Sequence, residues 1–214
     1  MSALTIGLHT VLLSKLAGKK GKLCVFEPNT ELLPQLTVTL EGLGNAVLFP
    51  FALSNKSEVA TLYVPENAEM GSLADWTAGR DDVGTTHTID CEVRRLDDLV
   101  DAGIVPRPDY IKCDAEGAEL LIFQGGEKTL NRAEAPIILF EANVHNARGF
   151  GLALDDAKNY LANVELPQYR FFEIQESESL IPIITPHPIH SNILAVPLSK
   201  LDRIANLTIG QLSR

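Results

Sequence analysis

The stretch "TIGLHTVLLSKLAGKKGKLCVFEPN" (residues 5–29) predicts a helix, a turn and a buried strand that ends in an acid. The helix is mostly apolar and stops at the glycines around Lys19 and Lys20. The strand over 22–28 is apolar on both faces, as expected for a parallel strand covered by helices, and Pro28 ends its pairing. This order is typical of the cofactor-binding half of an α/β enzyme.

The same alternation continues along the chain. A helix over 31–43 precedes a second strand at 45–54, and strands at 110–113 and 135–143 flank a helix that begins at Gly117. Alternating strands and helices with short connections predict an α/β fold with a doubly wound, mostly parallel sheet.

The remaining segments predict additions to this sheet. Residues 55–95 alternate like antiparallel or edge strands around the polar loop 70–86, and we interpret them as a β-rich insertion. Residues 146–214 predict a helix, the last strands and a helical tail at the sheet edge. The length predicts a single domain over 1–214, with its cofactor-binding core at 5–145.

Composition excludes several kinds of partner. The formal net charge is −10, from 18 basic and 28 acidic side chains, so we expect no nucleic-acid partner. The three cysteines are widely spaced and odd in number, which favours a reducing compartment and no zinc site. Every apolar run is shorter than the roughly 18 residues of a membrane span, so we expect no membrane partner and a cytoplasmic location.

In an open parallel sheet, ligands bind at the carboxyl ends of the strands, so acids that directly follow strands are the candidates. Glu27 ends the first visible strand, where it could accept hydrogen bonds from both ribose hydroxyls of a nucleoside cofactor. The alternative is an acid that only favours the dipole of the next helix. The strand-helix context favours the ribose interpretation.

A second set of acids lies in "KCDAEGAE" (residues 112–119). Asp114 and Glu116 follow a strand and Glu119 lies within the next helix, so three carboxylates must be solvated, paired with a cation or held at a raised pKa. The alternative is a set of helix N-terminal acids. A function is predicted for Asp114 and Glu116, and Glu119 stays open.

The third candidate is "FEANVH", in which Glu141 ends a strand and His145 follows in the loop. The pair could serve as general base and orienting group, or could hold a divalent metal. His187 and His190 lie in a Pro-rich loop without a nearby carboxylate in the sequence, so we interpret them as structural or exposed.

Taken together, "VFEPN" (25–29), "GSL" (71–73), "DYIKCDAEGAELLIFQGGEKTL" (109–130) and "PIILFEAN" (136–143) occur in an order that resembles the FkbM family of S-adenosylmethionine-dependent methyltransferases. The resemblance covers residues 5–145. It implies a class I methyltransferase fold, with a seven-stranded sheet whose last strand is antiparallel. It also implies S-adenosyl-L-methionine as cofactor and methyl transfer to an oxygen of a small hydroxylated molecule, such as a sugar or a secondary metabolite.

The resemblance also implies roles for individual residues. Glu27 would bind the ribose hydroxyls, and Asp114, Glu141 or His145 could accept the proton of the acceptor hydroxyl. The residues expected at the cofactor are Gly7, Glu27, Ala52, Leu53, Ser72, Asp114 and Glu116. Ala52 and Leu53 would lie near the adenine, and Ser72 would reach the cofactor from a loop.

The chain departs from the family at its start. The family's first strand ends in Asp-x-Gly-Ala-Asn-x-Gly, and only the tail of that motif matches here, with Gly7 at the last glycine. We therefore expect a chain truncated within this motif, whose first central strand is missing between 22–27 and 108–114. The two flanking strands would then face a gap with unpaired backbone groups, unless the sheet closes up, a partner chain covers them, or the gene product is longer.

Two other functions are weighed against a methyltransferase. A catalytically impaired interaction or regulatory module of the same fold would explain the lost start of the motif. A nucleotide-dependent oxidoreductase is the weakest alternative, because the glycine fingerprint before the helix is absent. We predict no metal site, while the metal requirement, the acceptor and assembly into a homo-oligomer stay open.

Overall fold

A computed structural model describes residues 4–175, 177 and 179–207. It divides into two compact units, Met1–Pro106 and Arg107–Arg214, which we name the N-unit and the C-unit and describe separately. No helix in the described part of the chain has the length and hydropathy that a membrane span requires.

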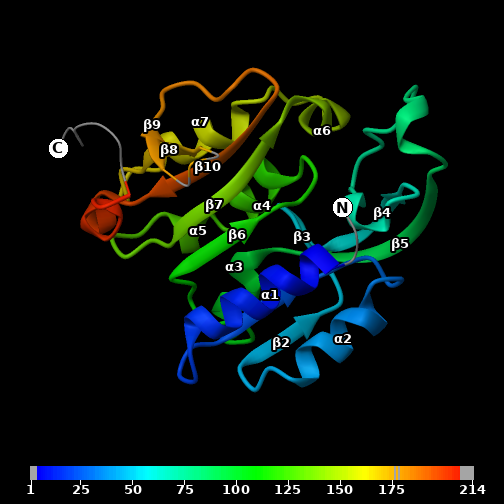
Figure 1. Ribbon diagram of the computed structural model, residues 1–214, viewed down its shortest axis with the longest axis horizontal. Helices are drawn as coiled ribbons and strands as arrows, with labels where there is room; N and C mark the ends of the chain where they lie inside the picture. Colours follow the sequence, from blue (N-terminus) through cyan, green and yellow to red (C-terminus); the bar gives the residue numbers. More distant parts are fainter. Residues whose placement is uncertain (1–3, 176, 178, 208–214) are drawn as a thin grey trace. The chain divides into compact units, whose positions relative to one another are not determined.

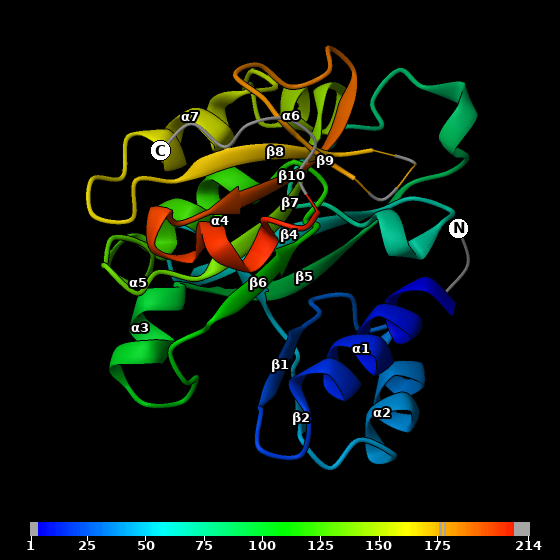
Figure 2. The same ribbon diagram turned by 60° about the vertical axis from the view of Figure 1, so that its left-hand side comes forward.

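The N-unit begins with the predicted helix, strand, helix and strand. The helix α1 (Leu4–Ala17) leads into β1 (Leu23–Phe26), and α2 (Leu33–Glu41) leads into β2 (Ala46–Phe49). The two strands pair in parallel, and both helices lie on the same face of the pair (Figure 2). These elements confirm the helix and strand predictions for this segment.

The strand predicted at 45–54 is divided into two. β2 ends at Phe49, and β3 (Ala52–Leu53) joins a different sheet. Pro50 has no N–H to donate to a ladder, and the buried ring of Phe51 packs 5.6 Å from that of Phe49. The proline and the buried aromatic ring together turn the chain from one sheet into the next.

A three-stranded sheet completes the N-unit. β4 (Glu58–Val64) and β5 (His87–Arg94) pair antiparallel, as the alternation of residues 55–95 predicts, and β3 joins β5 in parallel. Alternate side chains of these strands form a small core, which includes Leu62, Val64, Cys91 and Val93. The helix α3 (Leu96–Asp101) follows, and two short 3-10 turns, η1 (Ala68–Met70) and η2 (Asp81–Val83), lie between β4 and β5.

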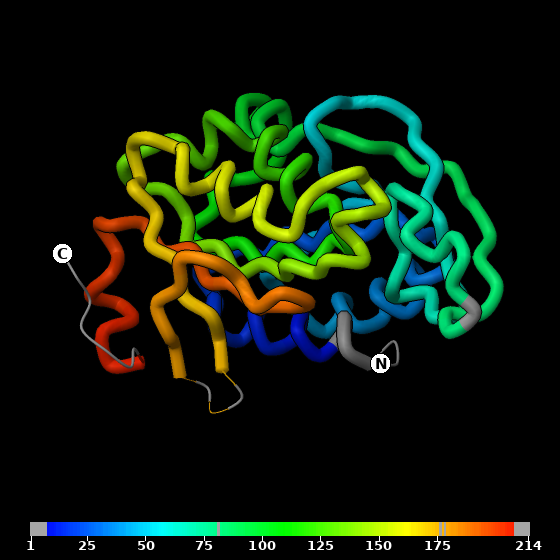
Figure 3. Tube along the Cα trace, turned by 90° about the horizontal axis from the view of Figure 1, so that it is seen from above, coloured from blue at the N-terminus to red at the C-terminus, as the bar shows by residue number. Residues whose placement is uncertain are grey.

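The C-unit contains a five-stranded sheet in the order β6, β7, β10, β8, β9 (Figure 1). The strands are β6 (Tyr110–Cys113), β7 (Ile137–Asn143), β8 (Arg170–Ile174), β9 (Leu180–Pro182) and β10 (His190–Val196). β6 and β7 are parallel, and the last strand, β10, is antiparallel to β7, in agreement with the prediction. β8 and β9 are also antiparallel to their neighbours and lie side by side in Figure 3.

The helices of the C-unit are α4 (Glu119–Gly125), α5 (Glu127–Leu130), α6 (Val144–Gly149), α7 (Asp156–Ala162) and the 3-10 helix η3 (Leu198–Ile204). Figure 1 shows α4 and α7 behind the sheet. Phe123 of α4 meets Phe140 of β7 edge to face, with ring centroids 5.4 Å apart, and Leu161 of α7 joins the same core. Ile138, Phe140 and Ala142 of β7 are buried, which leaves Glu141 on the opposite face of the strand.

Two further predictions concern the chain ends. In the described residues, β1 pairs with β2 and β6 with β7, and the proposed truncation within the family's first motif remains a prediction. The predicted helical tail at 198–214 begins as η3, and residues 208–214 lie outside the described part. β9 and α6 were not predicted.

Candidate active site

Glu27 directly follows β1 at the carboxyl end of the parallel strands of the N-unit. Its Oε1 accepts a hydrogen bond of 2.7 Å from the backbone N–H of Asn29. Burial raises the pKa of Glu27 to about 7, the N–H of Asn29 opposes the rise, and the neighbouring Glu69 carboxylate adds to it. The carboxyl group is therefore an acceptor that gains from further hydrogen-bond donors.

Asn29 fixes the loop that carries Glu27. Its side chain is 1 % exposed, donates to the carbonyl of Ala68 and accepts from the backbone N–H of Glu31. A buried amide with partners on both sides holds the turn after β1 against η1. The sequence indicates Asn29 as a cap for the next helix, but its contact with Ala68 was not predicted.

Four other residues expected at the cofactor also lie in the N-unit, whereas Asp114 and Glu116 belong to the C-unit. Gly7 is part of the first turn of α1, and Ala52 and Leu53 form β3. Ser72 is buried, with its Oγ accepting from the N–H of Ala74 at 3.4 Å and its backbone bridging to Tyr63. The expected roles of these four residues at the cofactor remain predictions.

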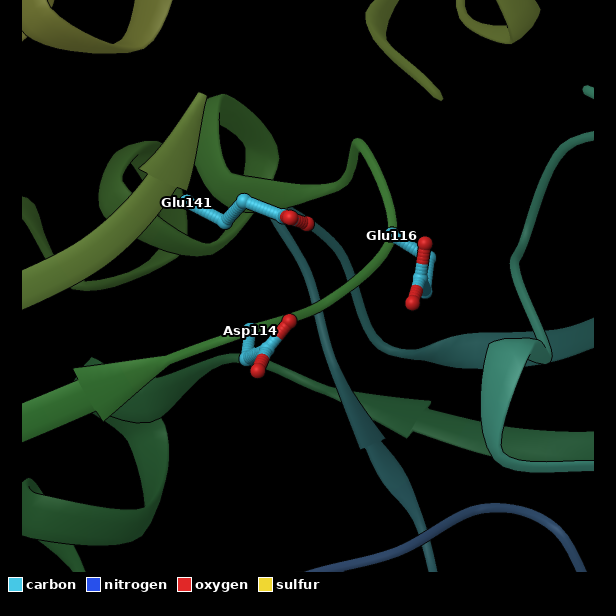
Figure 4. A group of neighbouring side chains, drawn as sticks. All are labelled: Asp114, Glu116 and Glu141. Carbon is cyan, nitrogen blue, oxygen red and sulfur yellow. The ribbon is translucent and has the colours of Figure 1, made fainter. Parts of the chain in front are cut away.

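In the C-unit, three carboxylates gather at the carboxyl ends of β6 and β7. Asp114 follows β6, Glu141 lies on β7, and Glu116 lies in the loop after β6 (Figure 4). One oxygen of each lies within 4.8 Å of the others. Lys112 adds a positive charge, since its Nζ lies 2.6 Å from Oδ2 of Asp114. The structure thus brings together three of the acids that the sequence singled out.

The loop that carries Glu116 has a special backbone. Glu116 has a φ of 49° and Gly117 a φ of 99°, both in the left-handed region. The buried side chain of Asn146, on α6, donates a hydrogen bond to the Glu116 carboxylate. Burial raises the pKa of Glu116 to about 8, the carboxylates of Glu141, Asp114 and Glu119 add to the rise, and Asn146 opposes it.

Glu119 has a structural place in this loop. It is 5 % exposed at the start of α4, and its Oε1 accepts a 2.8 Å hydrogen bond from the N–H of Ala115. Burial raises the pKa of Glu119 to about 7, against hydrogen bonds from the backbone. Its contacts match the alternative of a helix N-terminal acid, because the carboxylate closes the turn that leads into α4.

Glu141 pairs with His190. The Nε2 of His190 lies 2.6 Å from Oε1 of Glu141, because β10 runs antiparallel to β7 and its first residue lies opposite the end of that strand. Burial raises the pKa of Glu141, the Asp114 carboxylate adds to the rise, and His190 opposes it. His190 is exposed, as the sequence suggested, but a carboxylate distant in the sequence lies beside it.

The sequence suggested that His145 lies beside Glu141, but the structure places it elsewhere. It is exposed at the start of α6, where its backbone N–H donates to Oδ1 of Asn143. In the described part of the chain, His190 and not His145 is the imidazole beside Glu141. A catalytic role for His145 remains a prediction.

Ser191, the second residue of β10, is held by two hydrogen bonds. The buried Ser191 donates from Oγ to Glu173 at 2.5 Å, and accepts from the backbone N–H of His187 at 2.7 Å. These bonds fix the residue next to His190 and so limit the positions of its imidazole.

The carboxylate cluster is also a set of oxygen donors that a divalent cation such as Mg²⁺ accepts. Acidic groups of this kind are common without an ion, and Lys112 already supplies a positive charge. A hollow next to Glu141, lined by α4, α6 and the segment before α7, has room for about one water molecule. The expected absence of a metal site remains a prediction.

Comparison with known proteins identifies relatives of this chain. Residues 6–172 match the model of the methyltransferase FkbM domain. The hexuronic acid methyltransferase AglP of Haloferax volcanii is 27% identical over 140 residues, which cover 65% of this chain and 54% of that protein. The chain thus spans about half the length of this curated relative.

A solved structure has a similar fold. The crystal structure of the methyltransferase FkbM from Methylobacillus flagellatus KT matches 91% of this chain and 42% of its own, with a TM-score of 0.54 and 18% sequence identity. The match confirms the predicted α/β fold of the class I methyltransferase type.

Proposed function

The chain belongs to the FkbM methyltransferase family, and we propose that it transfers a methyl group from S-adenosyl-L-methionine to a hydroxyl oxygen of a small sugar-like acceptor. The similarity to a hexuronic acid methyltransferase supports a sugar as the acceptor. We also propose a reducing, cytoplasmic setting, because the three cysteines are widely spaced and odd in number. We do not assign nucleic acid as a partner, because the chain has a net charge of −10.

The observation that carries this proposal is the group of ionisable side chains at the ends of β6 and β7. The carboxylates of Asp114, Glu116 and Glu141 converge there, and His190 lies against Glu141. Burial and mutual repulsion raise the pKa values of Glu116 and Glu141, a property that is common at catalytic sites. Such a group can accept a proton and can also receive hydrogen bonds from the hydroxyls of a sugar.

In the N-unit, Glu27 fits a role at the ribose of the cofactor. Glu27 ends a parallel strand, and within the described chain a single N–H donor reaches it, which leaves acceptor capacity for two ribose hydroxyls. Hydrogen bonds from those hydroxyls would stabilise the charged form of a carboxyl whose pKa is raised to about 7. We propose Gly7, Ala52, Leu53 and Ser72 as further contacts of the cofactor.

A bound S-adenosyl-L-methionine supplies an electrophilic methyl group on a sulfonium. The chain must orient the acceptor hydroxyl and take its proton as the oxygen–carbon bond forms. We propose Glu141 as the base that accepts this proton. An Nε2–H of His190 would hold one carboxylate oxygen of Glu141 and leave the other for the hydroxyl. Asp114, held by Lys112, would orient the hydroxyl.

Calorimetric titration with S-adenosylhomocysteine tests the cofactor half of the proposal. We expect binding by the native chain and an affinity at least about tenfold lower for Glu27→Gln, because the neutral amide donates where the carboxylate accepted. Glu31→Gln is the matched control, an exposed acid of the same segment that pairs with His87. Absence of binding by the native chain at high micromolar ligand would contradict the proposal.

Methyl transfer to hexuronic acids and to neutral hexoses tests the acceptor half. We expect His190→Gln to lower kcat by about tenfold to a hundredfold, and His145→Gln to lower it less, because His190 contacts Glu141 and His145 is exposed. A larger loss of kcat for His145→Gln than for His190→Gln would instead support His145 as the catalytic histidine, as the sequence predicted. Binding of cofactor without methylation of any sugar would favour the non-catalytic module.

A further inference from the structure

The outer face of α1 carries exposed leucines, whereas its inner face buries hydroxyl groups. Leu8, Leu12 and Leu16 are 66%, 51% and 73% exposed, whereas Thr10 and Ser14 are 5% and 6% exposed. A spacing of four residues places the three leucines in one stripe along the helix. Most surface helices bury their leucines and expose their hydroxyls, so this stripe needs a partner.

Polar contacts on the inner face fix this orientation. The Oγ of Ser14 donates to Oδ1 of Asn45 at 2.6 Å. The Nδ2 of Asn45 donates to the carbonyls of Ser14 and Gly18 at 3.0 and 2.9 Å. Rotating α1 to bury the leucines would break these bonds, so the leucine stripe stays outside.

Four lysines lie in the last turn of α1 or directly after the helix. Lys15, Lys19, Lys20 and Lys22 are all exposed, and residues 1–26 contain no acidic side chain. The whole chain has a net charge of −10, so this basic segment is an exception to its composition. Long lysine side chains can follow an apolar surface with their stems while their ammonium groups reach a polar boundary.

We propose that α1 binds the surface of an anionic membrane, with the leucine stripe in the acyl boundary and the four lysines on the acidic headgroups. An interfacial helix needs an apolar face flanked by basic residues, and its affinity rises with anionic lipid. A second copy of this chain that paired through its own α1 would cover the leucines but would offer no acid to the lysines. The inference is independent of the methyltransferase activity and departs from the expectation of no membrane partner, which rested on the lack of a spanning segment.

Co-sedimentation with vesicles tests the proposal. We expect binding to phosphatidylcholine vesicles that contain about one-third phosphatidylserine, and far weaker binding to phosphatidylcholine alone. The double variants Leu12→Ser/Leu16→Ser and Lys19→Glu/Lys20→Glu should each lower the partition coefficient at least about tenfold. High salt should weaken the binding of the native chain, because it screens the lysines.

Matched substitutions elsewhere serve as controls. Leu166 is 61% exposed and the Lys56 side chain 66%, so Leu166→Ser and Lys56→Glu repeat the chemistry away from α1 and should leave partitioning unchanged. Circular dichroism checks that every variant is folded. Equal binding to neutral and anionic vesicles, or equal losses in the controls, would overturn the proposal. So would a dimer in sedimentation without vesicles that the leucine variant dissociates.

Discussion

Gly117 occupies a position that other residues cannot adopt without strain. Its φ is 99°, and a Cβ added there would lie 2.4 Å from the carbonyl oxygen of Asn146. We expect Gly117→Ala to lower the free energy of unfolding by about 2 kcal/mol or more, because backbone strain and a clash with another backbone act together. Urea denaturation measures the change.

Gly103→Ala separates these two effects. Gly103 also has a positive φ, 68°, but no atom lies within 4 Å of an added Cβ. Its substitution should cost about 1 kcal/mol from strain alone. Equal losses in the two variants would show that the contact with Asn146 adds nothing to the strain.

The carboxyl of Glu116 makes stability depend on pH in a defined direction. Its pKa rises from 4.5 to about 8, so the folded chain holds a proton that the unfolded chain has released between these values. The unfolded state then binds fewer protons, and the free energy of unfolding falls as pH rises from 4.5 to 8. Glu116→Gln cannot titrate and keeps an acceptor for Asn146.

The variant should therefore lose less stability than the native chain across this window. We expect a difference of about 1 to 3 kcal/mol between the two ends of the window, measured by urea denaturation at a series of pH values. Glu165→Gln, an exposed acid of the same unit, is the control and should leave the slope unchanged. A native slope retained in Glu116→Gln would mean that other groups, such as Glu119, set it.

The sequence could predict the acids of the site because each lies near the carboxyl end of a strand. Glu27, Asp114 and Glu141 all lie at or after the carboxyl end of a strand, where a parallel sheet presents side chains to ligands. His190 could not be found in this way. It reaches Glu141 through antiparallel pairing with a strand 49 positions away, which no local pattern encodes.

At the scale of elements, Asn45 joins α1 to the start of β2. Its side chain accepts from Ser14 and donates to two carbonyls at the end of the helix. Asn45→Asp keeps the acceptor, removes both donors and places a negative charge at a helix C-terminus. We expect a loss of about 1 to 3 kcal/mol in the free energy of unfolding.

Thermal or urea denaturation of this variant can be compared with Asn163→Asp. Asn163 ends α7 and donates to the carbonyl of Asn159, but this bond is exposed and water can replace it. Its substitution should change the stability by less than about 0.5 kcal/mol. Comparable losses in the two variants would contradict a special role for the part-buried junction between α1 and β2.

Elements with a strong local signal were predicted, and those set by tertiary context were missed. Residues 110–113 form β6 as predicted, because a short strand-like run ends at an acid. The strand at 45–54 was predicted as one, since periodicity does not show that Pro50 and a buried Phe51 direct the chain into a second sheet. β9 has three residues and depends on pairing with β8, so its own sequence carries little signal.

At the scale of the whole molecule, each unit has a core of its own. Phe140 belongs to the core of the C-unit, with its ring against that of Phe123, and Leu62 belongs to the core of the N-unit. The single tryptophan, Trp76, is buried in the N-unit and reports on that unit by fluorescence. The sequence predicts one domain, and the two cores suggest an experiment that decides between one cooperative unit and two.

Phe140→Ala should destabilise the C-unit by about 3 to 5 kcal/mol, because it leaves a cavity at a fully buried ring. If the cores unfold separately, peptides of β7 lose protection from hydrogen exchange at lower urea, while the midpoint of Trp76 fluorescence moves less than half as far. Leu62→Ala is the reciprocal variant and should shift mainly the fluorescence midpoint. We expect this separate behaviour, because three buried clusters each lie within one unit. Equal shifts of both probes in both variants would instead establish a single cooperative domain.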